Sequence, residues 1–262
     1  MKPWVEKFAR FGIMTRGFVY ILVGLLSLMA AMGVGGKTTD TKGALAAVVS
    51  IPFGEIIIWL LAVGLVGYVI WRAIQVIVDP EKYGHDFKGI STRMGFALSA
   101  VIHGSLAITA IKLASHAGSS EDPKYMVTAK VLSYPAGQWL IGLIGLGVIG
   151  FGLYQIFDGY SERFIRNLKT NEMDPREKIL MNNVGKIGII SRGIVFCVIG
   201  YFLIQTALYS NPDKEVGMDG ALQKIAEQTW GQWLLAFVAL GLLFYGIYQI
   251  MEGKNRHLNI NT

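Results

Sequence analysis

The stretch GEIIIWLLAVGLVGYVIWRAIQ (54–75) returns twice in changed form, as GQWLIGLIGLGVIGFGLYQIFD (137–158) and GQWLLAFVALGLLFYGIYQIME (231–252). Each copy opens on a glycine, has a second glycine ten residues later, and carries aromatic residues four and seven positions after that. Each is also long and apolar enough for a helix that crosses a bilayer, which takes about 20 residues. The repetition predicts a fold built from three related units.

A further apolar stretch precedes each copy, so the sequence predicts six transmembrane helices, at 12–33, 54–78, 93–114, 137–158, 186–209 and 231–252. The preceding stretches align as well, because Gly12, Gly95 and Gly188 coincide and each follows a base by two residues. Each unit is therefore a helical hairpin, with repeats at about 8–79, 91–162 and 184–256 in a single transmembrane domain covering 1–262. Since every repeat holds two spans, all three enter the membrane in the same sense. The economical arrangement places them around a pseudo-threefold axis along the membrane normal.

Composition supports an all-α membrane protein. Of 262 residues, 53% are hydrophobic and only 16% are charged, whereas soluble domains have about 25% charged residues. Fourteen of the 24 Lys and Arg lie in the N-terminus, the 79–93 and 159–186 loops and the C-terminus, and only six lie in the other connections. This bias accounts for the net charge of +6 without nucleic acid, and it predicts that both termini are cytoplasmic, in a bacterial inner membrane. The single cysteine, Cys197, offers neither a disulfide nor a cysteine metal site.

The connections on the opposite side, at 34–54, 115–136 and 210–230, have apolar residues at roughly helical spacing with polar residues between them. Two of them share a motif, GALAAVVSIPFG (43–54) and GALQKIAEQTWG (220–231). Segments of this kind are typical of helices that lie in the membrane interface. We therefore expect short amphipathic helices in the outer linkers.

Taken together, these motifs resemble a bacterial family of integral membrane proteins catalogued as domain of unknown function 1206. The resemblance rests on the triple hairpin, the Arg-Gly openings RGFVY (16–20) and RGIVF (192–196), the GAL linker and the closing G-x-W-L-L…Y-G-x-Y-Q pattern. It covers the chain from about Phe8 to Arg256 and implies the fold class rather than an activity. The middle repeat departs from the pattern, with Ser99-Ala100 in place of Arg-Gly.

Polar side chains recur on one stripe of the second helix of each repeat. The stripe begins at Gly64, Gly147 or Gly241 and continues at spacings of four, four and three residues, which share a helix face. Across the repeats, the stripe holds Tyr68, Phe151 and Tyr245, then Arg72, Gln155 and Gln249, and last Gln75, Asp158 and Glu252. Polar groups at this depth are costly unless they face the bundle or find partners. The stripe is therefore the first candidate for a functional site.

Three arginines lie at a depth similar to that of two acids of this stripe. Arg16 and Arg192 sit about one turn into their spans, where they either extend to lipid headgroups or face the bundle. Arg72 is expected to face protein, since its side chain leans toward the membrane interior. With Asp158 and Glu252, these arginines predict a belt of ion pairs and hydrogen bonds near the cytoplasmic face. The belt either binds an anionic headgroup or small anion, or only holds the hairpins together.

His103 lies near the membrane midplane, where the aligned residues are Tyr20 and Phe196. These aromatic counterparts favour a packed imidazole bonded to a neighbour, and a proton-relay or ligand role is the alternative. We expect no haem, other cofactor or metal, because the other histidines lie in connections or tails.

Three classes of function remain open. The favoured one is a non-enzymatic scaffold that binds membrane lipids, a second copy of the chain or a partner membrane subunit, because polarity collects at the cytoplasmic end of the spans. The alternative is a small-solute or ion transporter or channel that uses the pseudo-threefold axis. A membrane enzyme ranks last, since the sequence contains no nucleophile–base pair, metal cluster or glycine-rich phosphate loop.

Overall fold

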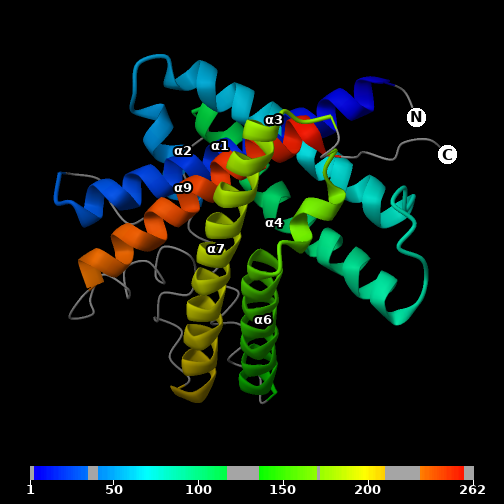
Figure 1. The fold of residues 1–262 in the computed structure, drawn as a ribbon. Helices are drawn as coiled ribbons and strands as arrows, with labels where there is room; N and C mark the ends of the chain where they lie inside the picture. Colours follow the sequence, from blue (N-terminus) through cyan, green and yellow to red (C-terminus); the bar gives the residue numbers. More distant parts are fainter. Residues whose placement is uncertain (1–2, 35–40, 117–135, 170–171, 210–230, 257–262) are drawn as a thin grey trace.

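The structure, a computed structural model, describes residues 3–34, 41–116, 136–169, 172–209 and 231–256. Within these ranges the chain is helical, with α1 (Pro3–Ala31), α2 (Thr41–Val49), α3 (Gly54–Ile77), α4 (Phe87–Ala114), α6 (Gly137–Tyr160), α7 (Pro175–Tyr209), α9 (Gly231–Asn255) and the short 3₁₀ helix η1 (Arg163–Asn167) (Figure 1). Six of the helices, all except α2 and η1, are long and apolar enough to cross a membrane. The predicted all-α fold with six membrane-spanning helices is confirmed.

The first helix of each repeat begins earlier than predicted. It begins at Pro3, Phe87 and Pro175, whereas the apolar stretches begin at 12, 93 and 186. Local signals account for two of these starts. Asp86 caps α4 by accepting a hydrogen bond from the Gly89 amide at 3.0 Å, and a proline suits the first position of α7 because its missing N–H is not needed there. Hydropathy alone finds only the apolar part of such helices.

One of the three predicted linker helices lies in the described residues. This helix, α2, buries Ala44, Leu45 and Val48 against α1, α3 and α4. Its apolar face is thus covered by protein, which fixes the linker between the first two spans. The linkers at 115–136 and 210–230 fall almost entirely outside the described residues.

The most extensive helix contacts join different repeats, through the pairs α1–α9, α3–α4 and α6–α7. Contacts within a repeat join α1 to α3 and α7 to α9. The helices therefore pack in the order α4, α3, α1, α9, α7, α6, and in the described part of the chain α4 and α6 share no extensive contact that would close the series. Figure 1 shows α6 and α7 extending together away from the other helices. The pseudo-threefold axis stays a prediction.

The base that precedes each aligned glycine lies at the carboxyl end of the second helix of another repeat. Arg10 donates to the Gly253 carbonyl at 2.9 Å, and Arg93 donates to the equivalent carbonyl of Val76 at 2.9 Å. The third base, Lys186, pairs with Glu162 at 3.1 Å, just beyond the end of α6. Cations are favourable at helix carboxyl ends, where carbonyl groups lack partners within the helix. These bases thus fix how neighbouring repeats dock.

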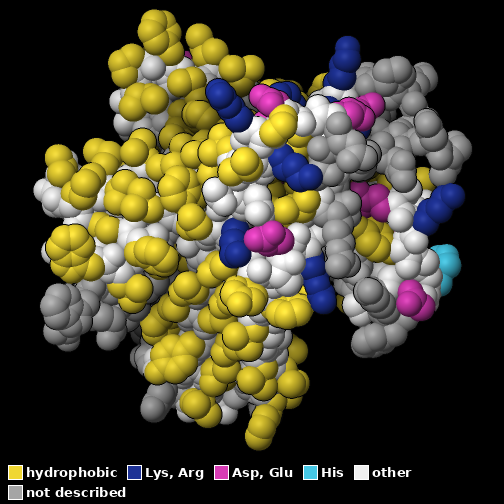
Figure 2. Space-filling view, in the orientation of Figure 1, with side chains coloured by type: hydrophobic (Ala, Val, Ile, Leu, Met, Phe, Trp, Pro, Cys, Tyr) yellow, Lys and Arg dark blue, Asp and Glu magenta, His cyan; other side chains and the backbone are white. Residues whose placement is uncertain are grey.

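On the face shown in Figure 2, apolar side chains predominate over the left and lower parts, and the charged ones gather toward the end where α1 begins and α9 ends. Exposed residues on the helices include Trp59, Leu98, Trp139 and Trp233. A surface of this kind suits contact with lipid rather than water. The fold therefore separates an apolar membrane region from a charged end.

Candidate functional site

Two glycines, Gly12 and Gly188, lie against a neighbouring helix and fix the positions of the two tyrosines of the stripe, Tyr68 and Tyr245. A Cβ atom on Gly12 would lie 2.3 Å from the backbone nitrogen of Tyr68, and one on Gly188 would lie 2.4 Å from that of Tyr245. Only glycine permits such an approach of two helices. One turn after each glycine comes an arginine, so the same contacts bring Arg16 and Arg192 to the level of the tyrosine hydroxyls.

The arginine side chains converge on these hydroxyl groups. Arg16 is 6% exposed, and it donates to the Tyr68 hydroxyl at 2.6 Å and to the Tyr245 hydroxyl. Arg192 also donates to Tyr245, and Arg72 donates to Tyr68 at 2.7 Å. These five residues, which we call the arginine–tyrosine layer, come from α1, α3, α7 and α9. Arg72 faces protein as predicted, and Arg16 faces the bundle rather than extending to the membrane surface.

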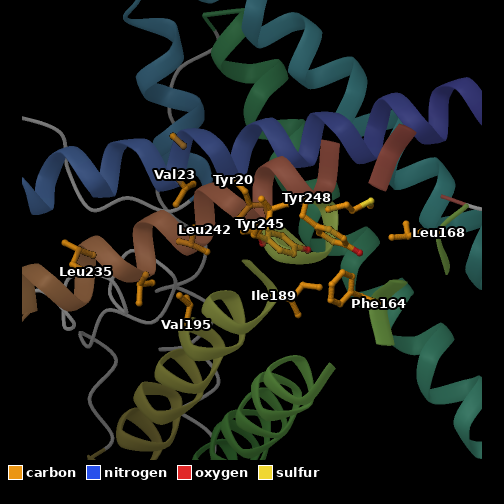
Figure 3. Close-up of a cluster of buried hydrophobic side chains, with 14 residues drawn as sticks. Tyr20, Val23, Phe164, Leu168, Ile189, Val195, Leu235, Leu242, Tyr245 and Tyr248 are labelled. Carbon is orange, nitrogen blue, oxygen red and sulfur yellow. The ribbon is translucent and has the colours of Figure 1, made fainter. Parts of the chain in front are cut away.

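Aromatic rings enclose the guanidinium groups from the sides. The Arg16 group lies 5.3 Å from the ring centre of Tyr68 and 5.6 Å from that of Tyr245, within the range of cation–π attraction. Tyr20 packs edge-on against Tyr245 at 4.9 Å, and Figure 3 shows the two side chains close together. Aromatic rings thus surround the layer on its sides, where they lower the local dielectric constant and strengthen its hydrogen bonds.

Ser99 and His103 extend the layer toward α4. The Ser99 hydroxyl lies 3.1 Å from the Tyr68 hydroxyl, and Nδ1 of His103 lies 2.8 Å from the Ser99 carbonyl oxygen. Because two arginines occupy the lone pairs of Tyr68, its proton is free for Ser99. The carbonyl contact places the His103 proton on Nδ1, an assignment made from the hydrogen bonding. His103 is thus a packed imidazole bonded to a neighbour, as predicted.

The three guanidinium groups of the layer lack acidic partners. Over the described residues, neither Arg16, Arg72 nor Arg192 forms an ion pair with a carboxylate. The buried Nε atoms of Arg16 and Arg192 also have no hydrogen-bond partner there. Burying a charge without an opposite charge costs several kcal/mol. The layer is therefore an electropositive centre held together by neutral acceptors.

A second network lies closer to the ends of α3 and α9, and it does contain acids. Arg256 contacts Glu252 at 2.6 Å and Glu81 at 3.2 Å, and the amide of Gln75 donates to Glu81 at 2.9 Å. Gln249 donates to the second oxygen of Glu252. We call this group the carboxylate network. It joins the layer through Arg72, which donates to Gln75 at 2.8 Å.

The carboxylate network accounts for two pKa shifts. Burial alone would lower the pKa of Arg256, but the carboxylates of Glu252 and Glu81 outweigh burial and raise it. Burial, followed by the Glu81 carboxylate, raises the pKa of the neighbouring Tyr83 to about 12. The network thus keeps Arg256 charged and Tyr83 neutral. Both of its carboxylates, Glu81 and Glu252, already pair with Arg256.

The predicted belt is therefore divided in two, and α6 of the middle repeat contributes little to it. Phe151, the counterpart of the two tyrosines, is 48% exposed and packs on Phe196. Gln155 is 6% exposed, and its Nε2 atom has no partner among the described residues. Asp158 is half-buried on α6.

Two residues of the carboxylate network, Glu81 and Arg256, escaped the sequence analysis. Both lie just outside the predicted spans and beyond the aligned stretches at 54–75 and 231–252. Arg256 carried a signal, since it follows Glu252 by four residues and so lies on the same face of a continuing helix. Glu81 carried none, because its place depends on the fold of the loop after α3.

Comparison with known proteins places this chain in a family. The model of the family described as Domain of Unknown Function (DUF1206) matches three times, over residues 11–79, 94–162 and 187–256. A curated relative, "Uncharacterized protein YxxB" of Bacillus subtilis (strain 168), is 38% identical over 257 residues, which cover 98% of this chain and 93% of the relative. No solved structure matches. The three matches coincide with the repeats at about 8–79, 91–162 and 184–256, and the chain is therefore a member of the DUF1206 family.

Proposed function

We propose that this protein is a non-enzymatic membrane protein that binds an anionic phosphate group at the arginine–tyrosine layer. The observation that carries the proposal is the group of three arginines, Arg16, Arg72 and Arg192, which share tyrosine hydroxyls and have no acidic partner in the described residues. Guanidinium groups are suited to phosphate because their fixed N–H donors match its oxygens. An anion would offset the cost of bringing these cations together.

The phosphate belongs either to a lipid headgroup or to a soluble anion. The depth of Arg72 favours the headgroup, since it lies five residues before the end of α3, or about 7–8 Å along the helix. Both arginines at the edges of the layer, Arg72 and Arg192, are only half-buried, so they remain accessible to a ligand. Arg16, Tyr68 and Tyr245 of the layer are buried where α1, α3 and α9 meet, which supports binding rather than conduction.

The test measures anion binding by wild type and by single variants. In nanodiscs of phosphatidylcholine with one-fifth phosphatidylglycerol, native mass spectrometry should detect phosphatidylglycerol retained on wild type. Retention should fall about tenfold for Arg72→Gln or Arg192→Gln, because each charged hydrogen bond contributes about 1.5–3 kcal/mol. Arg163→Gln, which removes an exposed arginine outside the layer, should retain lipid as wild type does.

A second arm identifies the source of the phosphate. Inorganic phosphate is titrated into delipidated wild type, and thermal unfolding is followed. Stabilisation by inorganic phosphate that is lost in Arg192→Gln would identify a soluble anion, whereas stabilisation by phosphatidylglycerol alone would identify a lipid. If neither probe distinguishes the arginine variants from wild type, the proposed function is wrong.

A further inference from the structure

The middle repeat leaves two helix faces open that the other repeats cover. Gly12 and Gly64 are buried in the first repeat, and Gly188 and Gly241 in the third. The equivalent Gly95 on α4 and Gly147 on α6 are exposed, and a Cβ atom at either would meet nothing within 4 Å on the described chain. The α4 face around Gly95 and the α6 face around Gly147 therefore lack the partners that the repeat pattern assigns to them.

One substitution within the repeat explains why these faces stay apart. In the first repeat the hydroxyl of Thr15 fills the notch at Gly64, where a Cβ would lie 1.9 Å from Oγ1. In the third, Ser191 fills the notch at Gly241 in the same way. The middle repeat has Leu98 at this position, and its branched side chain is too large for such a notch. The mismatch opposes packing of α4 on α6 within one chain, and equally between two copies of it.

The open faces are apolar. On α4 they carry Met94, Leu98 and Val101, which are 68%, 63% and 71% exposed. On α6 they carry Leu143, 65% exposed, and Phe151, 48% exposed. Flexible hydrocarbon chains can cover such a surface without the shape match that a helix requires, and hydrocarbon is the solvent on this part of the protein.

Both open faces end beside an arginine of the layer. On the α4 side, the Arg72 group stacks on Phe96 at 4.7 Å. On the α6 side, the Arg192 group stacks on Phe196 at 5.1 Å, and Phe196 packs on Phe151 at 5.3 Å. Two donors on this side also lack partners in the described residues, namely Nε of Arg192 and Nε2 of the buried Gln155. A ligand here would thus meet apolar faces along its length and cations at one end.

We infer that α4 and α6 form a lateral entrance for an anionic phospholipid, whose acyl chains lie on the two open faces and whose phosphate lies between Arg72 and Arg192. The inference rests on the proposed function, and it adds the ligand class, the route and the place of the chains. The lipid enters sideways from the leaflet on the side of the chain termini. The charge of the two arginines matches the phosphate, and the apolar faces match the chains.

The test maps where the acyl chains lie. Full-length protein is placed in phosphatidylcholine nanodiscs with a trace of phosphatidylglycerol that carries a diazirine on one acyl chain, and the labelled residues are located by mass spectrometry. Labelling should concentrate on Leu98, Val101 and Phe151 rather than on Trp59 or Trp233, which are exposed on other helices. Even labelling of all exposed helix faces would overturn the inference.

Two variants complete the test. Gly147→Phe fills the open face of α6 and should lower labelling and phosphatidylglycerol retention at least threefold, while thermal unfolding stays close to wild type because no atom of the described residues lies within 4 Å of a Cβ there. Gly142→Phe, on α6 near Ala207, is the matched control and should not lower labelling at Leu98. If Arg72→Gln lowers retention but Gly147→Phe does not, the proposed function survives and the lateral entrance is wrong.

Other occupants of the open faces give distinct results. A dimer in native mass spectra, together with protection of Leu98 from the lipid probe, would assign the faces to a second copy. Rapid intrachain disulfide formation in a Gly95→Cys, Phe151→Cys, Cys197→Ser variant would show that α4 closes directly on α6. Contact of the 115–136 linker with Gly147 in crosslinking would assign them to that linker. Each of these results overturns the inference.

Discussion

The contrast between occupied and open glycines predicts a large difference in stability between equivalent substitutions. In Gly188→Ala the added Cβ would lie 2.4 Å from the backbone of Tyr245, so α7 and α9 must separate. Overpacking of this kind costs about 1–3 kcal/mol, and the better helix propensity of alanine returns up to about 1 kcal/mol. Because the contact is with backbone atoms, which cannot rotate away, the cost lies at about 2–3 kcal/mol. The net loss is then about 1–2 kcal/mol, or a fall in melting temperature of about 2–8 °C.

The equivalent substitution Gly95→Ala meets no atom within 4 Å on the described chain, so only the propensity gain remains. It should leave the melting temperature unchanged or raise it by up to about 4 °C. The assay is thermal unfolding in detergent followed by intrinsic fluorescence, with far-ultraviolet circular dichroism to confirm equal helix content before heating. Gly12→Ala is the second member of the destabilised class, with its Cβ 2.3 Å from Tyr68. Equal losses for Gly95→Ala and Gly188→Ala would refute the reasoning, since they would mean that α4 is packed at Gly95 as α7 is at Gly188.

Three further predictions concern the layer, the carboxylate network and the loop after α3. Tyr245→Phe removes the acceptor shared by two arginines and should destabilise the protein by about 1–3 kcal/mol, whereas Tyr201→Phe, at an exposed tyrosine, should change the melting temperature little. Arg256→Met leaves two partly or fully buried carboxylates without their cation. It should cost about 3–5 kcal/mol, measured by denaturant unfolding in mixed micelles, and a loss under 1 kcal/mol would contradict this role. Hydrogen bonds from the backbone amides of Gly84 and then Tyr83 lower the pKa of Asp79 below 3.8. The loop should therefore keep its order above that pH and lose it as the pH falls through the lowered pKa. Hydrogen-exchange protection of the Gly84 amide checks this, and protection that rises on acidification would contradict it.

The repeats made most of the fold predictable, because a residue type that returns at equivalent positions marks a shared packing role. Gly12 and Gly188 illustrate this, since each meets the backbone of an aromatic residue from the stripe. The departures of the middle repeat were visible as well, in Ser99 and Phe151, but their consequence was not. Whether α4 packs on α6 depends on whether Leu98 fits the notch at Gly147, and hydropathy carries no information about such a fit.

The candidate site was predictable to the extent that its residues lie inside the repeats. Arg16, Tyr68 and Tyr245 were all found from the sequence, and the structure joins them by hydrogen bonds. The pairing was not predictable, because acids and bases at equal depth need not face one another. Glu252 lies at the predicted depth, but it pairs with Arg256 from beyond the repeated stretch. The arginines of the layer therefore donate hydrogen bonds to tyrosine hydroxyls instead of pairing with acids.

The contact between α1 and α9 also bears on how the chain is made. Arg10 near the start of α1 bonds carbonyl groups at the end of α9, and the two helices form one of the most extensive contacts in the fold. Translation reaches the end of α9 about 220 residues after the end of α1. At 5–20 residues per second this delay is about 10–45 s. During that time α1 lacks its main partner, so its glycine-rich face around Gly17 and Gly24 must be held by lipid, by the insertion machinery or by a chaperone until α9 is made.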